Sequence, residues 1–409
     1  MMSAFIVKRP GMHTSLGGIS VTIYFRRSLL LEAASLLRRD GPAFFRHLSL
    51  STAESELRDF VQDHFWRIGQ SMILKRTDRS LLDHVTAEDV DYLAIQLAQS
   101  PLFAPTSIPT LYPIVPIAVE EAFEGQTFCV VSPDALVEGA ALPEAWREAV
   151  VSHQFPPFAD WDGRKESPTS WLLVRVPHMG TGRKLSAAIL GSLALTVSAP
   201  YRYQFTGRKV FGGSCQLKVG TYSLRFHNSL TPALSENIIL KRADRDWLSV
   251  LDGKISSNAD ADIRQIKALQ YYYRAWFLDE AERFPINCMA LDSLLGADGA
   301  ATESVMTGAR TLLGEEVEWE RLSLLMRLRG SVMHGGAPDV YESSKYSKYY
   351  AKYGTDPITD MDAVVTECLR RSIFGASFVE QTDPYADIVE QQRELGRIPP
   401  AGSGKTILG

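Results

Sequence analysis

Closely spaced cysteines and histidines are absent from this 409-residue sequence, so the ligand spacings of zinc sites and redox motifs are missing. None of the eight histidines lies in a His-Glu-x-x-His pattern. The four cysteines lie about 70 to 90 residues apart, at Cys129, Cys215, Cys288 and Cys368. We therefore expect reduced thiols, no bound metal and no cofactor.

Long hydrophobic runs are also missing. The longest apolar stretch, residues 185–199, has 15 residues and includes Ser and Thr, whereas a membrane-spanning helix needs about 20 apolar residues. The first ten residues lack the basic start, the apolar run and the small-residue cleavage site of a secretory signal. These absences predict a cytoplasmic protein with no membrane partner, and a buried helix or strand over 185–199.

Neither sign of charge is in large excess, because 43 Lys and Arg face 48 Asp and Glu, for a net charge of -5. Hydrophobic residues make up 45% of the chain, and 29 Gly and 21 Pro are an ordinary share, which excludes extended disorder and low-complexity architectures. A nucleic-acid partner must therefore be recognised by a local basic patch.

Hydrophobic periodicity predicts an α+β multidomain chain. Residues 1–105 form a mainly helical region, with capping signals at Ser51 and Thr86. Residues 106–255 form a β-rich or α+β domain, residues 256–380 a helical domain, and residues 381–409 a polar, mobile tail. The strands expected in the middle domain cover residues 127–131, 170–176, 201–205 and 222–226.

The helical domain is predicted to be a bundle of four helices. The predicted helices are about 259–282, one that follows Pro285, 315–334, and one that starts with a capping box over Thr359–Asp362 and runs to Gly375. The third helix ends at Gly335 and Gly336, a pair typical of the position just past a helix C-terminus.

Arg329 and His334 lie near the end of the third predicted helix, and their side chains suit phosphodiester chemistry. A guanidinium can bind a phosphate oxygen in bidentate fashion, and an imidazole can exchange a proton near neutral pH. Five residues along an ideal helix separate two side chains by about 140°. Bringing both to one phosphate therefore requires fraying of the helix end at Gly335 or a second copy of the site from a partner chain.

Four helices with Arg-x-x-x-x-His near the end of the third, followed by Gly-Gly, resemble a HEPN domain over about residues 263–378. The most similar variant is the Apea-like group of bacterial anti-phage and abortive-infection proteins. The resemblance implies a metal-independent ribonuclease that acts as a homodimer, with Arg329 and His334 as catalytic residues. It also implies a role for Asp292 in orienting Arg329, because the family often carries an acidic residue after Ala-Leu in its second helix.

The residue after the motif arginine departs from the family pattern. This residue is commonly polar in the family, whereas here it is Gly330, with Ser331 as a substitute. A second interpretation therefore stays open, in which the helices form a non-catalytic module that binds nucleotide or RNA or that dimerises.

A basic patch surrounds the motif. Residues 321–353 carry six Lys and Arg against two Asp and Glu, whereas residues 279–320 carry two basic and ten acidic residues. The residues that we predict to bind RNA follow the motif at helical spacing, with lysines to neutralise phosphates and rings to stack on bases: Lys345, Lys348, Lys352, Tyr346 and Tyr349. Tyrosines at this spacing also pack into cores.

These features predict a metal-independent endoribonuclease with RNA as its substrate, in anti-phage defence or as a toxin. The region before the helical domain is expected to act as a sensor or regulator of a phage-derived or nucleotide trigger. The sequence identifies neither the trigger nor the RNA target.

Overall fold

The computed structural model describes residues 12–16, 19–23, 25–42, 45, 48–68, 85–100, 102–104, 107–138, 159–160, 163–164, 166–176, 179–218, 221–398 and 406–408. The chain forms two compact units. The first comprises residues 1–108 and 176–182, and the second comprises residues 109–175 and 183–409.

The first unit is mainly helical, as predicted, with one antiparallel hairpin in addition. Its elements are β1 (Met12–Leu16), β2 (Ile19–Ile23), α1 (Arg27–Asp40), α2 (Leu50–Ile68) and α3 (Ala87–Gln99). The capping box predicted at Thr86 is confirmed, because its hydroxyl accepts the backbone N–H of Asp89 while the Asp89 carboxylate accepts that of Thr86. The start of α2 lies earlier than predicted, since Ser49 accepts the N–H of Thr52.

The second unit is built on a six-stranded sheet with the order β11-β10-β3-β9-β6-β5. Its strands are β3 (Ile108–Ile114), β5 (Phe123–Glu124), β6 (Phe128–Val131), β9 (Ser170–Val176), β10 (Gly213–Lys218) and β11 (Thr221–Phe226). Smaller pairs are β4 (Ile117–Val119) with β12 (Ile238–Leu240), and β7 (Ala159–Asp160) with β8 (Gly163–Arg164). The helix α4 (Pro133–Glu138) follows β6.

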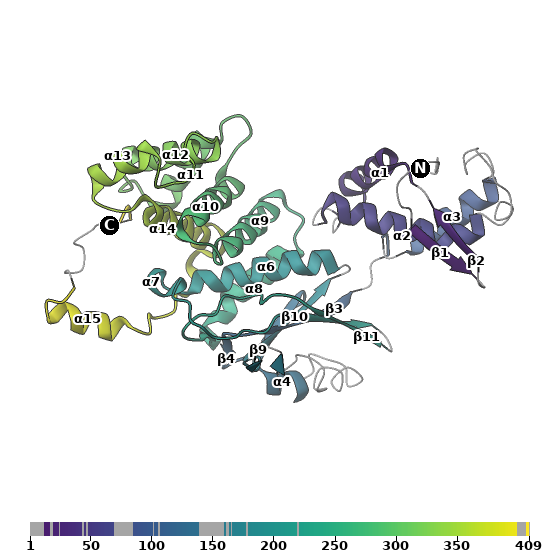
Figure 1. Ribbon diagram of the computed structural model, residues 1–409, viewed down its shortest axis with the longest axis horizontal. Helices are drawn as coiled ribbons and strands as arrows, with labels where there is room; N and C mark the ends of the chain where they lie inside the picture. The colour runs from purple at the N-terminus through teal and green to yellow at the C-terminus, as the bar shows by residue number, and fades with distance from the viewer. Residues whose placement is uncertain are drawn as a thin grey trace. The chain divides into compact units, whose positions relative to one another are not determined.

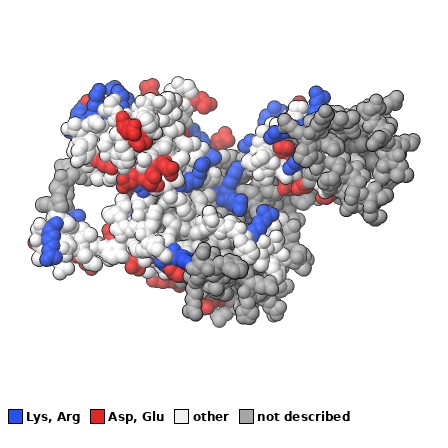
Figure 2. All heavy atoms as spheres, in the orientation of Figure 1, with Lys and Arg blue, Asp and Glu red and all other residues white. Residues whose placement is uncertain are grey.

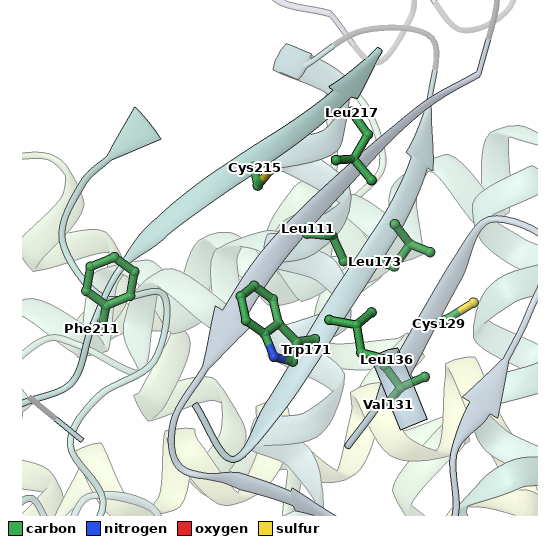
Figure 3. Close-up of a cluster of buried hydrophobic side chains, with 9 residues drawn as sticks. All are labelled: Leu111, Cys129, Val131, Leu136, Trp171, Leu173, Phe211, Cys215 and Leu217. Atoms are coloured by element: carbon green, nitrogen blue, oxygen red, sulfur yellow. The ribbon is translucent and has the colours of Figure 1, made fainter. Parts of the chain in front are cut away.

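Alternating side chains from several of these strands form one buried cluster, which includes Trp171, Leu173 and Cys215 (Figure 3). Three of the four predicted strands correspond to β6, β9 and β11. The strand predicted over residues 201–205 is wrong. Pro200 lies in the first turn of a short helix, α7 (Ala199–Arg202), and Phe205 forms an isolated bridge with Leu234.

Two helices join the sheet to the helical part of this unit: α6 (Met179–Thr196) and α8 (Arg245–Ser256) (Figure 1). The apolar run is thus a buried helix, not a strand. In α6, Gly191 lies so close to the helix α9 (Asp260–Ala275) that a Cβ atom built on it would be 2.3 Å from the Leu269 carbonyl oxygen. In α8, the Asp252 carboxylate accepts the backbone N–H groups of Gln126 and Thr127, just before β6.

The helical part contains six helices where the sequence predicted four. They are α9 (Asp260–Ala275), α10 (Glu280–Leu295), α11 (Ala301–Leu313), α12 (Trp319–Met333), α13 (Ser344–Tyr353) and α14 (Pro357–Leu369), which continues as a π-helical turn over Arg370–Phe374. The first predicted helix is divided by a turn, and Asp279 caps the start of α10 so that Pro285 lies inside it.

The segment expected to be a mobile tail contains structured parts. It forms the helix α15 (Ala386–Glu394), and Gln381 pairs with Ile239 through its side-chain amide. Near the end of the chain, Ile407 is 5% exposed and its backbone N–H donates to the Asp360 carboxylate at 2.9 Å.

A buried ion pair ties the two parts of the second unit together. Arg202, which is 1% exposed, donates to Asp362 on α14 at 2.8 Å and to two carbonyl oxygens at the end of α6, those of Ala194 and Val197. The second Asp362 oxygen accepts the Tyr203 hydroxyl at 2.8 Å and an amide N–H of Asn287 on α10 at 3.1 Å. The boundary expected at residue 255 is therefore crossed by a buried polar network, and both parts belong to one compact unit.

Replacing Asp362 with Ala leaves the Arg202 guanidinium buried without a counter-charge. We expect the free energy of unfolding to fall by about 3 to 5 kcal/mol, the usual cost of breaking a buried pair from one side. Urea unfolding of the full chain, followed by tryptophan fluorescence, measures the change. The control is Glu390→Ala, which breaks an exposed pair with Arg393 and is expected to cost about 0 to 1 kcal/mol. An equal loss of unfolding free energy in the two variants would contradict the conclusion that Arg202 and Asp362 form a stabilising buried ion pair.

Candidate active site

The site begins with an ion pair between two helices. Arg329, near the end of α12, donates from Nη2 to Oδ2 of Asp292 in the last turn of α10. The side chains are 17% and 27% exposed, so the guanidinium is largely covered but accessible. Burial raises the pKa of Asp292, and the neighbouring Arg329 opposes that shift. The structure thus brings together two of the three predicted catalytic residues.

His334 is held by the geometry of the helix end. It is the C-cap residue of α12, and Gly335 follows it with φ of 71°. The N–H of Gly336 donates to the Ser331 carbonyl at 2.7 Å and the N–H of Gly335 donates to that of Val332 at 3.2 Å, which is the Schellman arrangement. This arrangement fixes the backbone of His334 and leaves its ring exposed, without a hydrogen bond to the described residues.

The helix end is also linked to the next helix. Ser343, the N-cap of α13, donates to the hydroxyl of Ser331 at 3.1 Å. Ser331 therefore supports the loop between the two helices. Gly330 has open space around it, because a Cβ atom built there meets no atom within 4 Å.

The predicted lysines lie on α13 with different surroundings. Lys345 is half-buried and Lys348 is exposed, and neither forms an ion pair with a described residue. Lys352 forms an ion pair with Glu320 of α12 at 2.5 Å. Figure 2 shows Lys and Arg gathered on this face at the place of α13 and α12, with Asp and Glu gathered below them.

The two predicted stacking tyrosines differ in exposure. Tyr349 is 0% exposed, and its hydroxyl contacts Asp360 and Arg321, so the prediction that it stacks on RNA is wrong. It faces the core because α13 packs against α12 and α14 through this side chain. Tyr346 is half-buried and packs edge-on against the exposed ring of Tyr341, with centroids 5.2 Å apart.

A second buried ion pair was missed by the sequence analysis. Asp360 is 0% exposed and binds the Arg321 guanidinium through Nε at 3.0 Å and Nη2 at 2.5 Å.

The capping box predicted over Thr359–Asp362 is wrong, because α14 starts earlier with Asp356 as its N-cap. The available signal was Pro357, a residue favoured in the first turn of a helix.

No group of three or more metal-ligating side chains occurs within the described ranges. Among the described helices, none is long and apolar enough to cross a membrane. No family model, curated protein or solved structure matches the chain.

Replacing Gly335 with Ala is expected to strain the cap that holds His334, since an L-residue in the left-handed region costs about 1 to 2 kcal/mol. Nothing lies within 4 Å of the added Cβ at either position 335 or position 330. Gly330→Ala is therefore the matched control, which we expect to raise stability by up to about 1 kcal/mol because it lies inside the helix. Chemical unfolding of both variants measures the difference, and the same sign at both positions would refute the strained cap.

Proposed function

We propose that this chain is a metal-independent endoribonuclease of the HEPN type, with RNA as its substrate. The observation that carries the proposal is the end of α12, where Asp292 holds Arg329 and the Schellman cap presents an exposed His334. A fixed guanidinium and a free imidazole on one helix end are the groups that cleavage by the RNA's own 2′-hydroxyl requires.

The proposed reaction needs no metal-bound water. His334 moves the proton of the attacking 2′-hydroxyl or of the leaving 5′-oxygen, while Arg329 stabilises the charge on the in-line phosphorane. The 2′-oxygen forms a bond to phosphorus and the 5′-oxygen leaves, giving a 2′,3′-cyclic phosphate and a 5′-hydroxyl. Asp292 positions Arg329 by the ion pair that joins α10 to α12.

The enzyme is proposed to act as a homodimer through helices of the 257–378 segment. Arg329 and His334 are separated by about 140° around an ideal helix. A second copy of α12 supplies the missing residue to each phosphate. The region before residue 256 is proposed as the sensor or regulator, and anti-phage defence or a toxin role follows only from the family resemblance.

Gly330 supports a second candidate function, a non-catalytic module that binds RNA or nucleotide or that dimerises. The open space at this position marks where a polar side chain, common in the family, is missing. Gly330→Asn distinguishes the two candidates, because position 330 has room for a Cβ atom and the added amide should raise the cleavage rate only in a nuclease.

End-group analysis of cut RNA tests the chemistry. Cleavage is expected to persist in EDTA, to spare DNA and to leave 2′,3′-cyclic phosphate and 5′-hydroxyl ends. His334→Ala should lower the rate by about 10²- to 10⁴-fold, the usual contribution of a general acid or base. Arg329→Lys should lose most of the rate, since lysine keeps the charge but not the planar fork.

The matched control is Arg327→Ala, which removes an exposed arginine two residues away on the same helix and should leave cleavage unchanged. A mixture of the Arg329→Ala and His334→Ala proteins should recover activity if each centre draws on two chains. Cleavage that requires metal, or 5′-phosphate ends, would exclude this mechanism. A monomer that cuts RNA at micromolar concentration would exclude the dimer.

Salt dependence tests the lysines of α13. The plot of log K against log salt has a negative slope, and each lost phosphate contact makes it shallower by about 0.7 for single strands. Replacing both Lys345 and Lys348 with Ala should therefore make it shallower by about 1.4. Lys352→Ala serves as the control and should change the slope less, because Glu320 already neutralises that ammonium. Fluorescence anisotropy with a labelled RNA measures the slopes. Equal slopes for the parent and the double variant would assign both lysines to a solvated surface.

A further inference from the structure

A cavity of about 510 Å³ lies beside the loop that follows His334. Tyr203 and Phe205 line one part of it, Asp279, Glu280 and Arg283 at the start of α10 line another, and Tyr341 comes from the loop. Volumes of this size are typical of sites for small organic groups. Arg283 and Asp292 are nine residues apart on α10, which corresponds to about 13.5 Å along the helix axis. The cavity and the candidate active site therefore share one helix and one loop.

Arg283 is a buried cation for which the described residues provide no acceptor. It is 6% exposed, yet its guanidinium forms no ion pair or hydrogen bond with a described residue, and its Nε is buried and unpartnered. The guanidinium lies over the Tyr203 ring, 3.5 Å from the centroid. The equally buried Arg202 makes four hydrogen bonds. Because an unpaired buried guanidinium is costly, Arg283 is poised to bind an acceptor from outside the chain.

The cavity also offers flat apolar surfaces. Phe205 is 45% exposed and Tyr341 is 42% exposed. The Tyr341 ring is held in place because its hydroxyl donates to Glu280 Oε2 at 2.8 Å. Exposed, fixed rings beside a guanidinium are suited to stacking on an unpaired base.

Three carboxylates line the cavity and make a phosphate a poor occupant. Asp279 uses Oδ1 to cap α10, Glu280 uses Oε2 to accept the Tyr341 hydroxyl, and Asp339 uses Oδ1 to accept the backbone N–H of Glu342. The remaining oxygen of each carboxylate has no partner among the described residues. The occupant must therefore accept hydrogen bonds at one edge, donate them at another, and be planar and uncharged.

We propose that the cavity binds the base of an unpaired guanosine in the RNA substrate. Guanine presents two acceptors, O6 and N7, that match the Arg283 fork, whereas adenine places a donor beside N7. Its N1–H and N2–H groups are donors for the carboxylate of Glu280 or Asp279. This inference rests on the proposed function and names a sequence feature of its substrate.

The test measures binding to RNA that cannot be cut. The probes are fluorescent 2′-O-methyl oligoadenylates that carry one central guanosine, inosine, 7-deazaguanosine or adenosine. The guanosine probe should bind about tenfold more tightly than the adenosine probe, because one bidentate pair discriminates between bases by roughly this factor. Removing N7 in 7-deazaguanosine and removing the N2 amino group in inosine should each reduce the preference.

Variants assign the preference to the cavity. Arg283→Met keeps an unbranched chain in the buried position and should bind the guanosine and 7-deazaguanosine probes alike. Arg274→Met, which removes an exposed arginine from α9, should keep the guanosine preference. Glu280→Gln should make guanosine and inosine equivalent. Circular dichroism checks that each variant is folded, and the probe series on the parent protein decides the question without any variant.

Equal binding of the guanosine and adenosine probes by the parent protein would overturn the inference, as would a difference between the guanosine and 7-deazaguanosine probes that survives Arg283→Met. Free guanosine monophosphate that binds as tightly as the guanosine probe would also overturn it, in favour of a nucleotide ligand. A failure of the proposed nuclease function can be distinguished from a failure of the cavity assignment. Cleavage of unmodified RNA without a guanosine preference refutes the cavity assignment alone, whereas a guanosine preference without cleavage refutes the nuclease alone.

Discussion

The buried pair of Arg202 and Asp362 is the interaction on which the second unit depends. One guanidinium joins the end of α6 to α14, and the facing carboxylate also accepts Tyr203 and Asn287. Tyr203 also lines the cavity, and Asn287 lies on α10 between Arg283 and Asp292. Since a buried charge tolerates little displacement without losing a partner, the network fixes α10 relative to α14 and to the segment after α7.

Four arginines of this unit that are wholly or largely buried differ in how many acceptors the chain provides for them. Arg202 and Arg321 are paired with carboxylates that are themselves buried, and these pairs hold helices together. Arg329 is partly covered and is held by one carboxylate, and Arg283 lies over a ring with no acceptor. The first two are structural because carboxylates within the chain accept their hydrogen bonds, whereas the last two are the arginines that we propose to bind RNA.

The acidic stretch 279–320 and the basic stretch 321–353 contribute side chains to different surfaces of the second unit. The acidic stretch before α12 contributes Asp279 and Glu280 to the cavity, while the basic stretch after it places Lys345 and Lys348 on α13. One loop, from Gly335 to Ser343, connects the exposed imidazole to both regions. Under the proposed function, the two lysines contact phosphates of the RNA and the cavity takes one of its bases.

The sequence by itself determined the mixed α and β composition, the capping box at Thr86, three of the four predicted strands and the helix end at Gly335, because local propensities and caps act over a few residues. It also predicted a contact between Asp292 and Arg329, through a family resemblance. Only the tertiary structure decided that Asp360 and Asp362 are buried partners of distant arginines and not caps, and that Tyr349 faces the core. Identical residue types serve as caps, surface groups or buried ion pairs, and the choice depends on which cation or apolar surface the fold brings within a few ångströms. Arg283 shows the same limit, since nothing in its neighbouring residues indicates that its guanidinium is buried without an acceptor.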